Sequence, residues 1–142
     1  MTLLAGSKSN EMNGNKVIID TNLLILLSKG QLRLDHFFAK EYTHYAISIV
    51  TKMEALGYPF KSKAEEEFVN ELVAVFDLIH IDDDIANRVI TLRKKYRIKL
   101  PDAIICATAL THNALLYSND NKLPNIVDLK QIRFDTHDPS LS

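Results

Sequence analysis

Short apolar runs alternate with amphipathic segments along most of the chain. The run Val17-Ile18-Ile19 is continuous and β-branched, which is typical of a strand buried on both faces of a sheet. Similar runs at 45–49, 76–81 and 115–117 predict further strands, and a weaker run at 132–134 predicts a last one. The pattern therefore predicts a sheet of four to five short strands.

Between these runs, apolar positions recur at the spacing of an α-helix. Asp20, Thr21 and Asn22 are N-cap residue types and predict a helix that ends at Gly30. Further helices are predicted at 32–40, 51–56, 63–76, 85–96 and 101–112. In the 63–76 helix the expected buried stripe consists of Phe68, Leu72, Val75 and Phe76.

Strands that alternate with helices predict one α/β domain with a mainly parallel sheet. We place this domain at residues 16–135, with 1–15 as a flexible lead-in and 136–142 as a tail. In such sheets, binding sites form just beyond the carboxyl ends of the strands. We therefore expect catalytic or ligand-binding side chains at the carboxyl ends of the strands.

The composition narrows the class of protein. With 142 residues, 46% of them hydrophobic and 25% charged, the chain is neither disordered nor fibrous. Cys106 is the only cysteine, so no intrachain disulfide forms. The longest apolar run, 23–27, is far shorter than the ~20 residues of a membrane span, and we expect a cytoplasmic protein. The net charge of −1 gives no global attraction for nucleic acid, so any such attraction must be local.

Four acids fall at strand ends or helix starts, and each also has a structural interpretation. Asp20 can be a helix cap, and Glu54 can close a capping box with Thr51, three residues before it. Asp102 suits the first turn of a helix, where the macrodipole favours a carboxylate, and Asp120 is ordinary in an Asn-containing turn. Taken together, however, all four are expected at one edge of the sheet.

Carboxylates that converge in this way repel one another unless a cation neutralises them. Oxygen-only ligands suit hard divalent ions such as Mg²⁺. With one or two such ions, the group suits hydrolysis of a phosphodiester, in which a metal activates water and stabilises the leaving oxygen. The acids therefore predict a metal-dependent phosphodiesterase.

Four sequence blocks resemble the PIN domain in order and spacing, and more closely the VapC-type toxins of type II toxin–antitoxin pairs. The blocks are Val17-Ile18-Ile19-Asp20-Thr21-Asn22, Ser48-Ile49-Val50-Thr51-Lys52-Met53-Glu54, Leu100-Pro101-Asp102-Ala103-Ile104-Ile105-Cys106-Ala107-Thr108-Ala109 and Leu116-Tyr117-Ser118-Asn119-Asp120. The similarity spans about residues 16–134. It implies a three-layer α/β/α fold around the parallel sheet.

The resemblance also implies a function. It places Asp20, Glu54, Asp102 and Asp120 at the four acidic, metal-binding positions of a ribonuclease, with Thr21, Asn22 and Ser118 as polar supports. Mg²⁺ or Mn²⁺, as one or two ions, an RNA substrate, a homodimer and a cognate antitoxin are implied with them. Asn121, Lys122 and Leu123 depart from the family pattern, which often has another acid and an aromatic after the fourth acid.

A basic segment precedes the third block. Between residues 88 and 99 there are six cations and no acid after Arg88. Of these, we expect Arg93, Lys94, Lys95, Arg97 and Lys99 to bind RNA, with Tyr96 or Tyr45 available for stacking. The alternative is a solvated helix end, where cations are stabilising in any case.

Two rival functions remain at this point. The first is a phosphatase that is phosphorylated on Asp20. Such enzymes have the motif Asp-x-Asp at this point, but position 22 is Asn, so the acid that protonates the leaving group is missing. A catalytically silent PIN-like module that binds RNA or regulates is the other alternative. Retention of all four acids argues against it, since clustered charge is costly.

Overall fold

The computed structural model describes residues 16–31, 44–118 and 123–133. The predicted lead-in at 1–15, the predicted helix at 32–40 and the predicted tail at 136–142 lie outside these ranges.

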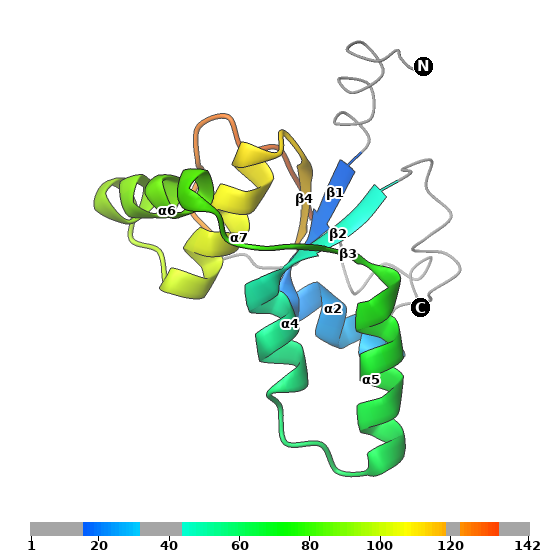
Figure 1. The fold of residues 1–142 in the computed structure, drawn as a ribbon. Coiled ribbons are helices and arrows are strands. Elements are labelled where there is room, and N and C mark those ends of the chain that lie inside the picture. Colours follow the sequence, from blue (N-terminus) through cyan, green and yellow to red (C-terminus); the bar gives the residue numbers. More distant parts are fainter. Residues whose placement is uncertain (1–15, 32–43, 119–122, 134–142) are drawn as a thin grey trace.

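Within them, five strands form one sheet in the order β3-β2-β1-β4-β5 (Figure 1). The strands are β1 (Lys16–Ile19), β2 (His44–Ser48), β3 (Asp77–Ile79), β4 (Leu115–Ser118) and β5 (Gln131–Arg133). Every neighbouring pair is parallel, as predicted. The chain moves outward from β1 to β3 and then crosses to the other side of β1, so a topological switch point lies at the carboxyl end of β1.

Helices cover both faces of the sheet and complete a three-layer α/β/α fold (Figure 1). The described helices are α2 (Thr21–Ser28), α4 (Ile49–Leu56), α5 (Lys63–Val75), α6 (Asp83–Lys95) and α7 (Leu100–Thr111). α2 and α5 pack on one face, and α6 and α7 pack on the other. α4 contributes Ala55 to the first core and Val50 to the second.

The alternation of side chains along β1 divides the core into these two halves. Val17 and Ile19 pack toward α2 and α5, whereas Ile18 packs toward α6 and α7. All three are fully buried, which explains why β1 is continuously apolar after Lys16 rather than apolar at alternate positions. β1 pairs in register with β2 and β4, so Asp20 leaves the sheet directly beyond the Ile19–Tyr117 pair.

Two glycines end helices for different reasons. Gly30 follows α2 at φ +71°, the left-handed conformation that glycine adopts without strain. Gly57 follows α4 at φ −80°, but a Cβ there would lie 2.7 Å from the carbonyl oxygen of Met53. The second glycine is therefore required by close backbone approach.

Some local predictions are wrong. α4 begins at Ile49 rather than at Thr51, because Ser48 caps it by accepting a hydrogen bond from the Val50 amide at 3.1 Å. The third strand is shorter than predicted. On α5, Phe68 and Val75 are exposed, and the buried stripe consists of Val69, Leu72, Val73 and Phe76, which repeats at three, four and seven residues.

No helix in the part of the chain that the structure describes is long and apolar enough to cross a lipid bilayer.

Candidate active site

The first acid, Asp20, leaves the carboxyl end of the central strand. Its backbone amide donates to the Tyr117 carbonyl oxygen of β4 at 3.0 Å, which extends the sheet by one residue. Its Oδ1 accepts from the Leu23 amide at 2.8 Å, so the predicted helix cap is confirmed. The side chain is 6% exposed and also lines a hollow, so capping fixes this carboxylate without removing it from the site.

The second acid, Glu54, is held by α2 and not by a capping box. Thr51 is the third residue of α4, is fully buried, and lies with its Oγ1 3.0 Å from Thr21 Oγ1. The same Thr21 hydroxyl donates to Glu54 Oε1 at 2.7 Å. The capping-box interpretation is therefore wrong, because Ser48 already caps the helix and Glu54 reaches across to a neighbouring helix. A buried pair of threonines sets the direction of this carboxylate.

The third acid, Asp102, lies in the first turn of α7, which begins at Leu100, with Pro101 next. Its carboxylate lies where the positive end of the helix dipole favours a negative charge. Asp102 lines the same hollow as Asp20 and Glu54. Three acids that are up to 82 residues apart, from position 20 to position 102, therefore line one hollow at the switch point of the sheet.

The hollow that they share has a volume of about 260 Å³. Its wall is completed by polar and apolar side chains, namely Thr21, Asn22, Ile25, Tyr58 and Ile105. A second, larger hollow of about 470 Å³ adjoins it, since Asn22, Glu54 and Asp102 line both. The second hollow, but not the first, is also lined by Arg97, Lys99, Leu123 and Pro124.

The predicted polar supports differ in their positions. Thr21 is buried and orients Glu54. Asn22 is exposed and lines both hollows. Ser118 is 2% exposed at the carboxyl end of β4, on the same edge of the sheet. Asp120, the predicted fourth acid, lies outside the described residues.

The donor set suits a hard divalent cation, since it offers carboxylate, amide and hydroxyl oxygens around one hollow. As the side chains lie, no three His, Cys, Asp or Glu residues of the described ranges are close enough to hold an ion. Asp20 is tied to the Leu23 amide and Glu54 to Thr21. The ligand types fit, and binding an ion would require the carboxylates to approach one another.

The predicted basic segment divides into two parts. Arg97 and Lys99, in the loop between α6 and α7, line the larger hollow beside the acids. Arg93 instead donates from Nε to the Ile98 carbonyl oxygen at 3.4 Å, and Lys95 Nζ lies 5.5 Å from the Tyr96 ring centroid. Lys94 is exposed on the last turn of α6 and is not among the residues that line the hollow.

The two tyrosines that were predicted to stack on RNA line neither hollow. The Tyr96 ring packs against the α6/α7 core, and its hydroxyl accepts from the Val127 amide at 3.2 Å. Tyr45 packs against the other core from β2. The aromatic residue at the acidic hollow is Tyr58, which the sequence analysis missed. The available signal was its position directly after Gly57, where the helix that carries Glu54 ends.

Comparisons with known proteins identify the family of this fold. The family model of the PIN domain matches residues 17–129. No curated protein sequence matches the chain significantly. Among solved structures, a chain of a toxin–antitoxin complex from Klebsiella pneumoniae is 34% identical, with a TM-score of 0.66, and the match covers 85% of this chain and 98% of that one.

Two further structures are more distant in sequence and share the fold. A chain of the VapBC2 complex from Rickettsia felis, solved with a promoter DNA fragment, is 16% identical with a TM-score of 0.71, over 84% of this chain and 99% of that one. A chain of DNA-bound VapBC from Salmonella typhimurium is 20% identical with a TM-score of 0.71, over 83% and 97%. The resemblance to VapC-type chains that the sequence motifs predicted is confirmed. The family match spans most of the domain, and the chain belongs to the PIN domain family.

Proposed function

We propose that this chain is a divalent-metal-dependent endoribonuclease and the toxin of a toxin–antitoxin pair. The observation that carries the proposal is the meeting of Asp20, Glu54 and Asp102 around one hollow at the switch point of the sheet. Membership of the PIN family and the likeness to toxin-complex chains support a nuclease of this kind. RNA as substrate and the need for metal are the finer parts of the proposal.

Asp20, Glu54 and Asp102 are the proposed ligands of one or two Mg²⁺ or Mn²⁺ ions, with Asp120 as the fourth acid expected from the sequence. When bound, such an ion lowers the pKa of a water molecule and stabilises the charge on the phosphate and the leaving oxygen. The hollow offers no described cysteine or histidine as a nucleophile. Hydrolysis by water is therefore the reaction that these residues suit.

The remaining residues bind and orient. The Leu23 amide holds the Asp20 carboxylate, and the Thr21 hydroxyl holds that of Glu54, so both residues are positioned at the hollow before substrate arrives. Asn22 lies between the two hollows and can donate to a phosphate oxygen with its side-chain amide. Arg97 and Lys99 supply positive charge along the larger hollow, which a polyanion needs when it approaches a group of acids.

The proposed partners are an RNA, a cognate antitoxin and a second copy of this chain. The similar chain from Klebsiella pneumoniae belongs to a toxin–antitoxin complex, and this supports an antitoxin partner. The homodimer rests on the family resemblance alone.

The test is cleavage of a defined single-stranded RNA by the purified protein with Mg²⁺, with Mn²⁺ and with excess chelator. We expect cleavage only with a divalent ion, and complete loss with chelator. Undiminished cleavage in chelator contradicts the metal-dependent mechanism. Metal-dependent binding of RNA without any cleavage, over a panel of RNA sequences, favours the catalytically silent alternative.

A further inference from the structure

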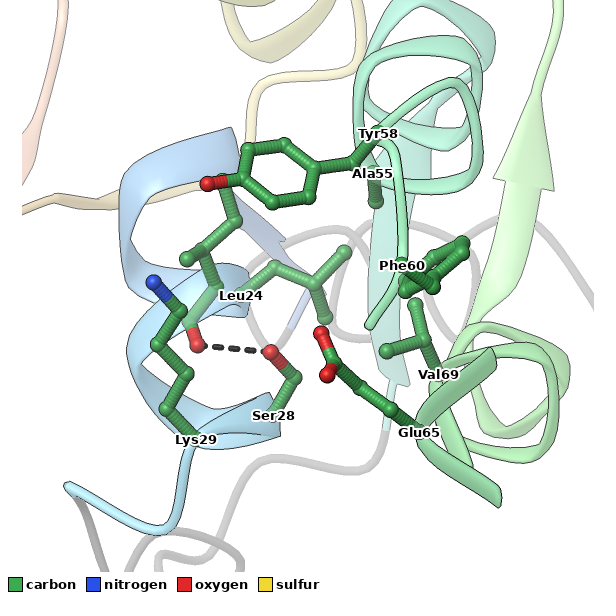
Figure 2. Close-up of a pocket in the computed structure, with 9 residues that line it drawn as sticks. Leu24, Ser28, Lys29, Ala55, Tyr58, Phe60, Glu65 and Val69 are labelled. Atoms are coloured by element: carbon green, nitrogen blue, oxygen red, sulfur yellow. Dashed lines mark hydrogen bonds between the residues drawn. The ribbon is translucent and has the colours of Figure 1, made fainter. Parts of the chain in front are cut away.

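Tyr58 stands between two hollows of different character. On one side it lines the acidic hollow with Asp20, Glu54 and Asp102. On the other side it covers an apolar pocket between α2 and α5, whose walls include Leu24, Ala55 and Val69 (Figure 2). This ring is the aromatic side chain that the lining of the acidic hollow contains.

The ring is held in place but remains available. Gly57 ends α4, and its position requires glycine because a Cβ there would meet the Met53 carbonyl oxygen. Tyr58 then lies across the pocket toward α2, with its hydroxyl directed away from α4 (Figure 2). Phe60 packs beside it with ring centroids 6.4 Å apart at 60°. Half of the Tyr58 surface is nevertheless exposed, at 50%.

Positive charge accompanies the ring. Lys29 Nζ lies 5.9 Å from the Tyr58 ring centroid, at the end of α2. A flat aromatic face with a neighbouring cation is the combination by which proteins bind single-stranded nucleic acid, because the base stacks and the backbone phosphate is attracted. In the larger adjoining hollow, Arg97 and Lys99 supply cations without an aromatic.

We propose that Tyr58 stacks against the nucleobase next to the cleaved phosphodiester, with Lys29 attracting the adjacent phosphate, and that it sets part of the base preference of cleavage. This inference rests on the proposed ribonuclease function. A stacked base must be unpaired, so the substrate is a single-stranded segment that runs from Tyr58 across the acids to Arg97 and Lys99. The apolar pocket beneath the ring supports it and does not receive the base, since its free space is only about 20 Å³.

The test compares Tyr58→Leu, Tyr58→Phe and the control Phe68→Leu. Phe68 is an exposed aromatic on α5 that lines none of these hollows. Single-stranded RNAs that carry the fluorescent base 2-aminopurine at one position at a time are bound in chelator, where no cleavage occurs. Stacking on an aromatic ring quenches this fluorophore, so the quenched position identifies the base that contacts the ring.

We expect quenching at one position beside the cleavage site, its loss in Tyr58→Leu, and its retention in Tyr58→Phe and Phe68→Leu. RNA affinity should fall about ten-fold in Tyr58→Leu only, within the range for loss of one base–aromatic contact. With Mg²⁺, the same variant should cleave with a flatter preference at the quenched position. Quenching and base preference unchanged by Tyr58→Leu, in a protein whose wild type cleaves RNA, overturn the inference and leave the proposed function intact.

Two other outcomes also decide. Loss of antitoxin binding in Tyr58→Leu with unchanged RNA cleavage assigns the ring to the protein partner and overturns the inference. Absence of RNA binding and cleavage by the wild type, with every metal, overturns the inference together with the proposed function.

Discussion

The acids and the cations of this chain are arranged in opposite ways. Asp20, Glu54 and Asp102 are far apart in sequence but meet at one hollow. Arg93 and Arg97 are four residues apart but have different environments. Arg93 donates a hydrogen bond to the Ile98 carbonyl oxygen, whereas Arg97 lines the larger hollow. Strand ends of a parallel sheet bring distant residues together, whereas a helix end and the loop after it separate near ones. Proximity in sequence is therefore a poor guide to membership of the site.

The largest expected effect follows from removing charge at the acids while keeping the helix cap. In Asp20→Asn the side chain can still accept from the Leu23 amide, because Asn caps as well as Asp does. We expect near-normal thermal stability and at least ~100-fold slower RNA cleavage, because the electrostatics of the site are broken.

Asp82→Asn is the matched control for that change. Asp82 caps α6 with the same geometry, its Oδ1 accepting from the Ile85 amide at 2.8 Å, but it lines neither hollow. Its replacement should leave cleavage unchanged. Equal cleavage by both variants would reduce Asp20 to a structural cap.

A smaller loss is expected from the hydroxyl that orients Glu54. Thr21→Val removes the donor to Glu54 and leaves the buried Thr51 hydroxyl without this partner. Loss of a group that orients a ligand typically costs 10–100-fold in metal affinity or activity, so we expect about ten-fold slower cleavage. The free energy of unfolding should fall by about 1 kcal/mol. The control is Thr91→Val, at an exposed position of α6. An unchanged kcat in Thr21→Val would contradict the orienting function of the Thr21 hydroxyl.

The two parts of the basic segment can be separated by salt dependence. Arg97→Gln with Lys99→Gln should reduce the slope of log K against log salt by about 1.4, since each single-strand phosphate contact contributes ~0.7. Lys94→Gln with Lys95→Gln, outside the hollow, should change it by less than half as much. If both pairs change the slope equally, RNA follows the whole basic segment and not the hollow alone.

The smallest effect lies at the opposite edge of the sheet and concerns stability only. Burial and the nearby Lys16 lower the pKa of His112 below its ordinary 6.5, against a smaller opposing influence of Asp82. The unfolded chain therefore binds this proton more readily, and the free energy of unfolding should decrease as the pH falls below about 6.5. His112→Gln should make that decrease shallower in pH-dependent melting, with cleavage at neutral pH unchanged. An equally steep decrease in the variant assigns it to other groups.

The sequence was informative where one force dominates a position. Burial on both faces makes Val17, Ile18 and Ile19 of β1 apolar, and the sheet then places the acid that follows them. The prediction was wrong where two residues could both cap the same helix. Ser48 caps α4, whereas the capping-box interpretation assigned the cap to Thr51. The wrong stripe on α5 has a similar cause, because Phe68 and Val75 are apolar but lie beside the packed face. For Tyr58 the sequence offered only its position after Gly57, since its place at the hollow also depends on the packing of α2 beside it.

Glu54→Gln tests whether the acids around the hollow hold a cation that cleavage needs. Gln keeps the size of the side chain and can still accept from Thr21, but it lacks the charge. The measurement is the rise in melting temperature with increasing Mn²⁺, together with RNA cleavage, in the wild type and the variant. At a given concentration, an ion stabilises the folded state more the more tightly it binds, and the increase is logarithmic. We expect the wild type to be stabilised, the variant to require far more Mn²⁺ for the same rise, and cleavage to fall at least ~100-fold. Equal stabilisation by Mn²⁺ and near-normal cleavage in Glu54→Gln would contradict the account and place the metal among other residues.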